Sequence, residues 1–298
     1  NVLNINNHID SIFFNPYANV NSKFKINNSI WIQDDKCYEP NSQYINTIDS
    51  TFNAEVSYVN FYKDRTSILK DINEWVNKKT FGTIKKVVSK NDIKKNTTQA
   101  LISSIYFKDN WQFPFDSSKT KSKPFFKKED STMVDMLHKK NKYAYYQSKN
   151  HQILELPYQS DGVSMYIILP SKNIELDDFI NIFDYDLLLK SFDNISYNLV
   201  SVSIPKFETN FSTSIKEHLI SLGMNIPFNP LKANFDKFWD YQNQCKKYPP
   251  KNYIDVINHK SYIKVDENGT EASAATAIII SRVTSIRPFD PLIFNANR

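Results

Sequence analysis

Glycine and cysteine are both rare in this chain. Four of the 298 residues are glycine, whereas glycine makes up about 7% of an average protein. A glycine that is kept against such a bias is expected where the backbone needs one. The two cysteines, Cys37 and Cys245, lie far apart in the sequence. They exclude a disulfide framework and a cysteine metal site, and so few cysteines are typical of a reducing compartment.

The motifs of common enzyme classes are also absent. The sequence has no GxSxG nucleophile elbow, no P-loop and no GxGxxG loop, and its five histidines show no HExxH spacing. Nothing groups a nucleophile with a base or gathers metal ligands. We therefore predict that the protein is not an enzyme and that it needs no metal or cofactor.

Charge and hydropathy argue against two classes of partner. The net charge is +5, but the positive residues are mostly lysines scattered among Asn, Asp and Glu, without an arginine-rich block. This pattern argues against nucleic-acid binding. No apolar run approaches the length that crosses a bilayer, which argues against a membrane protein.

The chain is long enough for a substantial core and has neither internal repeats nor a clean linker, so we predict a single domain over residues 1–298. Periodicity predicts strands at 24–32, 54–61, 97–107 (largely buried), 123–126, 132–137, 142–147, 153–158, 163–169, 199–207 and 253–265. It predicts helices at 41–52, 66–76 (capped by Asp64), 176–192 and 214–222. The strand-rich second half indicates an α+β class with large sheets.

The segment 264–283, KVDENGTEASAATAIIISRV, combines an acidic start with a run of small residues. Its alanines could form a short helix, although they offer no apolar stripe at helical spacing. Read as a strand, the segment places Thr270, Ala272, Ala274 and Thr276 on one face, and all four are small and uncharged. Glu271 falls on the other face. The segment alone slightly favours a strand that could enter a crowded sheet.

Several separated segments together resemble one known family. In chain order they are INEWVNKKTFGTI (72–84), ALISSIYFKDNWQFPF (100–115), VDMLHKKNKYAYYQ (134–147), ILELPYQSDGVSMYIILP (153–170), VSIPKF (202–207), SLGM (221–224), INHKSYIKVDENGTEASAATA (257–277) and FNANR (294–298). They resemble the serpins, a family of serine protease inhibitors, from about residue 24 to the C-terminus. The amino-acid sequence of residues 153–170 and the presence of only two cysteines are most similar to what is seen in the intracellular, ovalbumin-related branch. Because the abundance of Asn, Lys, Ile, Tyr and Phe is typical of an AT-rich genome, a poxviral serpin is a further hypothesis.

The resemblance implies an α+β, serpin-like fold with a large central sheet A, sheets B and C, surrounding helices and an exposed reactive loop. It also implies inhibition of serine-type endopeptidases by a suicide-substrate mechanism, in which the cut loop adds to sheet A as a strand. The implied partner is a target serine protease, and the inhibitor is expected to be a monomer. Two alternatives are a non-inhibitory serpin-fold binding protein and an inactive truncated serpin.

The resemblance also assigns the reactive loop residue by residue. The hinge consists of Glu267, Gly269, Thr270, Glu271, Ala272, Ser273, Ala274, Ala275, Thr276 and Ala277. In the family's register, seventeen positions counted from Glu267 end at Val283. The reactive bond is then Val283–Thr284, which suits an elastase-like protease. A loop one residue shorter places the bond after Arg282, which suits a trypsin-like protease.

Three further residues stand at positions that the family uses in its sheet-opening region. Trp111 and His259 match residues near the top of sheet A, where packing and hydrogen bonding are implied to control opening. Ser103 stands where the family usually has Asn in the central strand. We expect a weaker hydrogen bond across sheet A at that position.

The family's N-terminal helices and last two sheet-B strands have no counterpart here, so we expect a sequence that is partial at both ends. The cysteine usage and the branch favour the cytoplasm, which would be the host cytoplasm for a viral protein. An extracellular location stays open as an alternative because the true N-terminus is expected to be missing.

Overall fold

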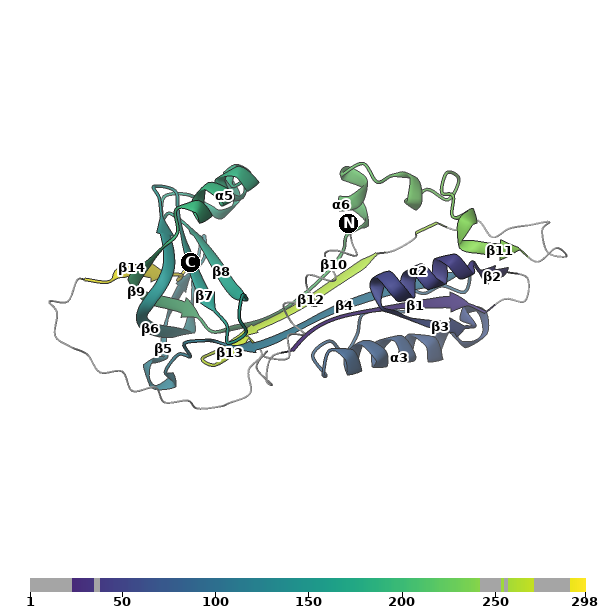
Figure 1. Cartoon of the computed structure of the whole chain (residues 1–298), viewed down its shortest axis with the longest axis horizontal. Helices are drawn as coiled ribbons and strands as arrows, with labels where there is room; N and C mark the ends of the chain where they lie inside the picture. Colours follow the sequence, from purple (N-terminus) through teal and green to yellow (C-terminus); the bar gives the residue numbers. More distant parts are fainter. Residues whose placement is uncertain (1–22, 35–37, 242–252, 255–256, 271–289) are drawn as a thin grey trace. The chain divides into compact units, whose positions relative to one another are not determined.

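The computed structural model describes residues 23–34, 38–241, 253–254, 257–270 and 290–298 (Figure 1). Internal contacts divide the chain into two compact units. Among the described residues, the first unit lies within 23–107 and 209–262, and the second lies within 108–208 and 263–298. The strands β4 (Gln99–Asn110), β10 (Phe207–Ser214) and β12 (Asn258–Val265) contribute residues to both units. The expected single domain stays a prediction.

In the first unit, two helices lie beside a pair of strands (Figure 1). β1 (Lys23–Gln33) pairs in parallel with β3 (Ala54–Val59), next to α2 (Ser42–Phe52) and α3 (Phe61–Lys79). α3 packs through five buried side chains at helical spacing: Phe61, Ile68, Leu69, Ile72 and Val76. Because burying each large apolar side chain is worth about 1.5–3 kcal/mol, this stripe determines which side of α3 faces inward.

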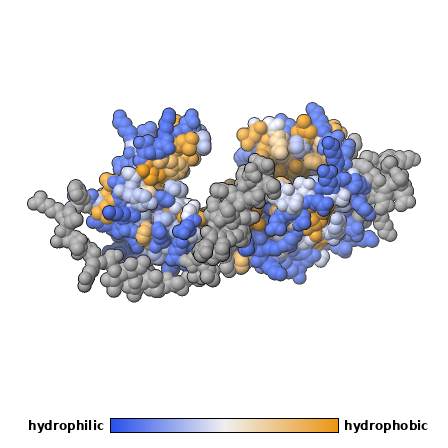
Figure 2. All heavy atoms as spheres, viewed as in Figure 1, coloured by the Kyte–Doolittle hydropathy of each residue, from blue (hydrophilic) through white to orange (hydrophobic). Residues whose placement is uncertain are grey.

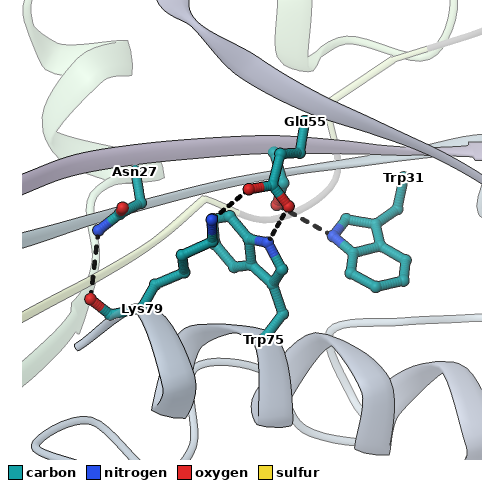
Figure 3. A network of polar contacts seen from close by, with 6 residues as sticks. Asn27, Trp31, Glu55, Trp75 and Lys79 are labelled. Carbon is teal, nitrogen blue, oxygen red and sulfur yellow. Dashed lines mark hydrogen bonds and ion pairs between the residues drawn. The ribbon is translucent and has the colours of Figure 1, made fainter. Parts of the chain in front are cut away.

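A polar network attaches the C-terminal half of α3 to β3 (Figure 3). Glu55 accepts a hydrogen bond from Nε1 of Trp75 at 2.7 Å and forms an ion pair with Lys79. The Lys79 ammonium also lies 5.7 Å from the centre of the Trp75 ring. The hydrogen bond from Lys79 lowers the pKa of Glu55. Because both carboxylate oxygens have a partner on α3, Glu55 fixes the rotation of this helix against the strand.

The remaining elements of the first unit are short. β2 (Tyr38–Pro40) pairs antiparallel with β11 (Trp239–Tyr241), and α6 (Lys216–Ser221) is followed by the 3₁₀ turns η2 (Ile226–Phe228) and η3 (Asp236–Phe238). Figure 2 shows hydrophobic residues over α6 and the segment after it. Leu222, Met224 and Ile226 are exposed there.

Two of the predicted helices differ from the observed ones. α3 begins about one turn early because Asn60, and not Asp64, caps it: the Asn60 side chain accepts a hydrogen bond from the Lys63 N–H at 3.0 Å. Asp64 lies inside the helix with non-helical angles, φ −116° and ψ 26°. The predicted helix 176–192 is two helices, α4 (Leu176–Ile182) and α5 (Tyr185–Asp193). They are separate because Asp184 is extended and caps α5 through the N–H of Leu187.

The second unit contains a sheet of six strands: β5 (Lys121–Phe126), β6 (Ser131–Gln147), β7 (His151–Pro157), β8 (Ser164–Pro170), β9 (Ser196–Pro205) and β14 (Leu292–Asn295). Their order is β14-β9-β6-β7-β8, with β5 on β6. The short 3₁₀ turn η1 (Ser117–Lys119) precedes β5. The predicted hairpin β7–β8 is confirmed. β6 is one strand of 17 residues where two short strands were predicted, because it pairs with β5, β7 and β9 along its length.

The other six-stranded sheet has the order β10-β12-β13-β4-β1-β3, in which β13 is Gly269–Thr270. The α+β class with large sheets is therefore confirmed. β4 is not largely buried as predicted, because its side chains alternate: Leu101 and Ile105 are 65% and 58% exposed, whereas Ile102 and Tyr106 are buried. Such alternation is typical of a strand with one covered face.

Candidate functional site

The start of the hinge is already a strand in the second unit. In β13, Gly269 is opposite Asn110 and Thr270 is opposite Asp109 on β4, while Thr270 also pairs with Val265 on β12. Both pairings are antiparallel. For these two residues the strand interpretation of the segment is confirmed over the helix. Residues 271–277 of the predicted hinge lie outside the described residues, as do Arg282, Val283 and Thr284 of the predicted reactive bond.

Gly269 occupies a position that admits no side chain. A Cβ placed on it would lie 2.1 Å from the carbonyl oxygen of Asp109 and 2.7 Å from Cα of Asn110. Both atoms belong to the backbone and cannot move aside without breaking the β4 pairing. The other three glycines, Gly82, Gly162 and Gly223, have positive φ angles of 87°, 77° and 96°. All four therefore lie where the backbone needs glycine, as the composition predicted.

Thr270 is buried and bonded through its hydroxyl. It is 4% exposed, and its Oγ1 lies 2.5 Å from the hydroxyl of Tyr158, a residue that directly follows β7. Burial raises the pKa of Tyr158 far above its ordinary value, so the phenol stays neutral and can donate to or accept from Thr270. The site thus accepts a small hydroxyl side chain.

Trp111 holds the turn that leads into β13. It is 1% exposed, and its ring stacks on Tyr158 with 4.6 Å between the ring centres. The indole Nε1 donates to the carbonyl oxygen of Asp266 at 3.0 Å, and the Trp111 backbone N–H donates to that of Asn268 at 2.7 Å. The Asp266 carboxylate accepts from the Asn268 N–H at 2.9 Å and closes the turn.

Glu267 is fixed on both sides of its carboxylate. Oε2 lies 2.9 Å from Nζ of Lys206, and Oε1 accepts from the hydroxyl of Thr120 at 3.0 Å. The carbonyl oxygen of Glu267 accepts from the Phe115 N–H at 2.7 Å. Burial alone would raise the pKa of Glu267, but its hydrogen bonds, above all the one from Lys206, outweigh burial and lower it. The same pair raises the pKa of Lys206.

Four residues of this site were not predicted from the sequence: Tyr158, Lys206, Thr120 and Asp109. Tyr158, Lys206 and Asp109 belong to segments that carried the family resemblance, which was the one signal available for them. Asp109 is 2% exposed, and its carboxylate accepts from the Ser160 N–H at 3.2 Å. Thr120 gives no sequence signal, because its role depends on pairing with a residue far along the chain.

The other predicted sheet-opening residues lie in the first unit. Ser103 is an exposed residue of β4, and His259 lies on β12, with its side chain outside the described residues. Trp111 belongs to the second unit. The roles of Ser103 and His259 in sheet opening therefore stay predictions.

The sequence model described as "Serpin (serine protease inhibitor)" matches residues 4–298. The chain belongs to the serpin family. It is 30% identical to an uncharacterized serpin-like protein, TK1782, of Thermococcus kodakarensis over 91% of this chain and 60% of the relative. It is 32% identical to Serpin B10 of Sorex araneus over 84% of this chain and 62% of the relative. This serpin thus spans about three fifths of the length of these relatives.

The predicted serpin fold is confirmed by solved structures. The native state of the thermophilic serpin tengpin matches with a TM-score of 0.82 and 26% identity, over 99% of this chain and 72% of that one. The family is one of inhibitors, in agreement with the prediction that this serpin is not an enzyme. In the described ranges, no helix has the length and hydropathy to span a membrane, and no group of three acidic, His or Cys residues could hold a metal ion.

Proposed function

We propose that this serpin inhibits a serine protease by the suicide-substrate mechanism. The observation that carries the proposal is β13: two hinge residues already pair antiparallel between β4 and β12. Addition of an extended segment to a sheet is a known mode of recognition, in which main-chain hydrogen bonds give the energy and alternate side chains give the specificity. With Thr270 facing inward, the next inward positions in period two are Ala272, Ala274 and Thr276, all small and uncharged.

The chemistry of the proposed step belongs to the protease. Its serine Oγ attacks the carbonyl carbon of the reactive residue, the C–N bond breaks, and the new amino group of the following residue leaves with a proton. The ester that results ties the protease to the N-terminal side of the cut. This side is continuous with β13, so further pairing along β4 and β12 would carry the protease away before water can cleave the ester.

We assign the reactive bond to Val283–Thr284, with Arg282–Val283 as the alternative. A small aliphatic residue before the bond suits an elastase-like protease, and an arginine suits a trypsin-like one. The experiment is to incubate the protein with one protease of each type and to look for an SDS-resistant complex. Mass spectrometry of the released C-terminal peptide then identifies the bond. Cleavage in the loop without any stable complex would contradict inhibition and favour a non-inhibitory or inactive serpin.

The finer assignments rest on the sequence. We propose that this protein is an ovalbumin-related serpin that acts as a cytoplasmic monomer. The amino-acid sequence of residues 153–170 and the presence of only two cysteines support this proposal. The poxviral source stays a hypothesis from composition alone. Size-exclusion chromatography with light scattering tests the monomer directly.

A further inference from the structure

His151, the first residue of β7, is buried in the second unit with both ring nitrogens bonded. It is 1% exposed. Its Nε2 lies 2.9 Å from the hydroxyl oxygen of Ser191 on α5, a helix at one end of the sheet (Figure 1). Its Nδ1 lies 3.2 Å from the hydroxyl oxygen of Ser148, in the turn between β6 and β7. One imidazole ring thus joins a strand, a turn and a helix.

The hydroxyl partners determine which nitrogen of the neutral ring carries the proton. Ser191 donates its only hydroxyl hydrogen to the carbonyl oxygen of Leu187 at 2.7 Å, so its oxygen accepts from His151. Nε2 is therefore the donor. A neutral imidazole has one donor nitrogen and one acceptor nitrogen, so Nδ1 accepts the hydroxyl hydrogen of Ser148. Both nitrogens of the neutral ring are satisfied.

The same hydroxyls leave no acceptor for a second ring proton. The Ser148 oxygen already accepts from the backbone N–H of Asn150 at 3.2 Å and from that of His151 at 3.1 Å. These two bonds use both lone pairs of a hydroxyl oxygen. A proton on Nδ1 would point at this oxygen and find no lone pair. A buried donor without an acceptor is destabilising, and more so when the group is charged.

Among the described residues, no carboxylate is placed to compensate a charge on His151. Three aromatic rings pack around it, with 5.4 to 5.7 Å between ring centres: Tyr146, Phe179 and Phe183. The acidic residues of α4, α5 and their caps are all exposed: Glu175, Asp177, Asp178, Asp184, Asp186 and Asp193. Glu155 is on the same face of β7, but it is four positions away, about 13 Å along the strand, and accepts from the Ser164 hydroxyl.

The elements around the ring carry cations instead. Lys149 follows Ser148 in the turn, Lys190 precedes Ser191 on α5, and both are exposed. Arg298 donates to the carbonyl oxygen of Pro170, the residue opposite His151 on β8. Burial lowers the pKa of His151, the direction expected where a charged ring gains no partner.

We propose that His151 is an acid-sensitive latch, which holds α5 on β7 while its ring is neutral and releases α5 and the neighbouring α4 when the ring gains a proton. The inference does not depend on the proposed inhibitory function. Release would uncover Ile153, which is fully buried on the same face of β7, and Phe179 of α4. The second unit would be closed near neutrality and partly open in acidic surroundings, as in other histidine switches.

The direction of the pH effect follows from where the proton binds more tightly. A released, solvated histidine has a pKa of about 6.5, and the latched ring binds the proton less tightly than that. The latch is therefore at full strength above about pH 6.5 and weakens as the pH falls below it. The ratio of released to latched molecules increases by up to about tenfold for each pH unit.

The test is hydrogen exchange of the backbone amides of α5 in the full chain between pH 7.5 and pH 5, corrected for the pH dependence of the chemical exchange rate. Binding of a hydrophobic dye reports uncovered apolar surface in parallel. The variant is His151→Gln, which keeps an N–H donor for Ser191 and cannot gain a proton. The matched control is His138→Gln, which removes a histidine from β6 in the same unit.

In the unaltered protein we expect the α5 opening constant to rise at least tenfold from pH 7 to pH 5, while amides of α3 keep their protection. His151→Gln should give a constant that does not change with pH, and His138→Gln should keep the rise. An α5 opening constant that is flat in the unaltered protein would overturn the latch. So would a rise that persists in His151→Gln, or one that α3 shares, because either would show general acid unfolding.

If His151→Gln does not fold, nitrogen NMR of the unaltered protein gives the decision. The ring should carry its proton on Nε2 at neutral pH, and signals of a protonated ring should appear only in molecules whose α5 amides have lost protection. A neutral ring protonated on Nδ1, or a charged ring beside a fully protected α5, would overturn the proposal.

Discussion

Thr270 decides which side chains can begin the insertion. Its hydroxyl bonds to a neutral, buried Tyr158, and the residue opposite it on β4 is the buried Asp109. We predict that Thr270→Arg converts the inhibitor into a substrate, because a position at which threonine is 4% exposed cannot take so long a side chain without displacing its neighbours, which blocks strand addition. The measurement is the yield of SDS-resistant complex against the yield of cleaved inhibitor. Thr270→Ser keeps the hydroxyl and should keep the complex. A stable complex with the arginine variant would contradict the prediction.

Gly269 supports the same strand by lacking a side chain. We predict that Gly269→Ala expels β13 from between β4 and β12, since the added methyl would lie 2.1 Å from the Asp109 carbonyl oxygen. Hydrogen exchange of the backbone amides at 268–270 should rise by at least tenfold. Asn268→Ala, which keeps the backbone bond to Trp111, is the matched control. Unchanged protection in Gly269→Ala would show that the backbone relaxes around the methyl.

Glu267 makes the stability of the hinge depend on pH. Because its pKa is lowered in the folded state, its stabilising effect is complete above the unfolded-state pKa of about 4.3 and is lost as the pH falls through the lower folded-state pKa. We predict that Glu267→Gln costs about 1–3 kcal/mol at pH 7 and progressively less below about pH 4.3. Urea unfolding from pH 7 to pH 3 measures this. Glu129→Gln, at an exposed position, is the matched control.

At the scale of elements, the residue that caps α3 differs between the sequence-based prediction and the structure. Asn60 caps this helix, while Asp64 lies in a kink. We predict that Asn60→Ala lowers the free energy of unfolding by about 1 kcal/mol, because the Lys63 N–H loses its side-chain acceptor and keeps only the Asn60 carbonyl oxygen at 3.2 Å. Asp64→Ala serves as the comparison and should cost less than half as much. If Asp64→Ala is the more damaging change, the cap is at the position that the sequence first indicated.

The extents of strands and helices show what the sequence could and could not give. β1, α2 and the β7–β8 hairpin lie where periodicity and turn residues placed them, because their signals are local. β6 was divided in two, since its continuity comes from three partner strands that a local pattern does not reveal. β4 appeared buried because its apolar run hides an alternation that depends on which face is covered.

The candidate site was predictable only as far as the family resemblance reached. Glu267, Gly269, Thr270 and Trp111 were identified by their motifs, and the structure places all four around β13. Lys206 and Tyr158 lay in recognised segments but had no assigned role. Their roles arise from pairings that join residues 61 and 112 positions apart, and such pairings are set by the sheet rather than by any local pattern.

At the scale of the whole molecule, the two units share three strands, because β4, β10 and β12 each contribute residues to both. Each of these strands is one continuous backbone segment with residues in both units. We therefore predict that the chain unfolds in a single cooperative transition despite its two units. Hydrogen exchange with mass spectrometry at increasing urea should give the same midpoint for amides of α3 and of β7, which belong to different units. Two separate midpoints would mean that each unit is stable alone and would overturn the predicted single domain. Thr270→Arg provides an internal check, because a change at β13 should then shift both midpoints together.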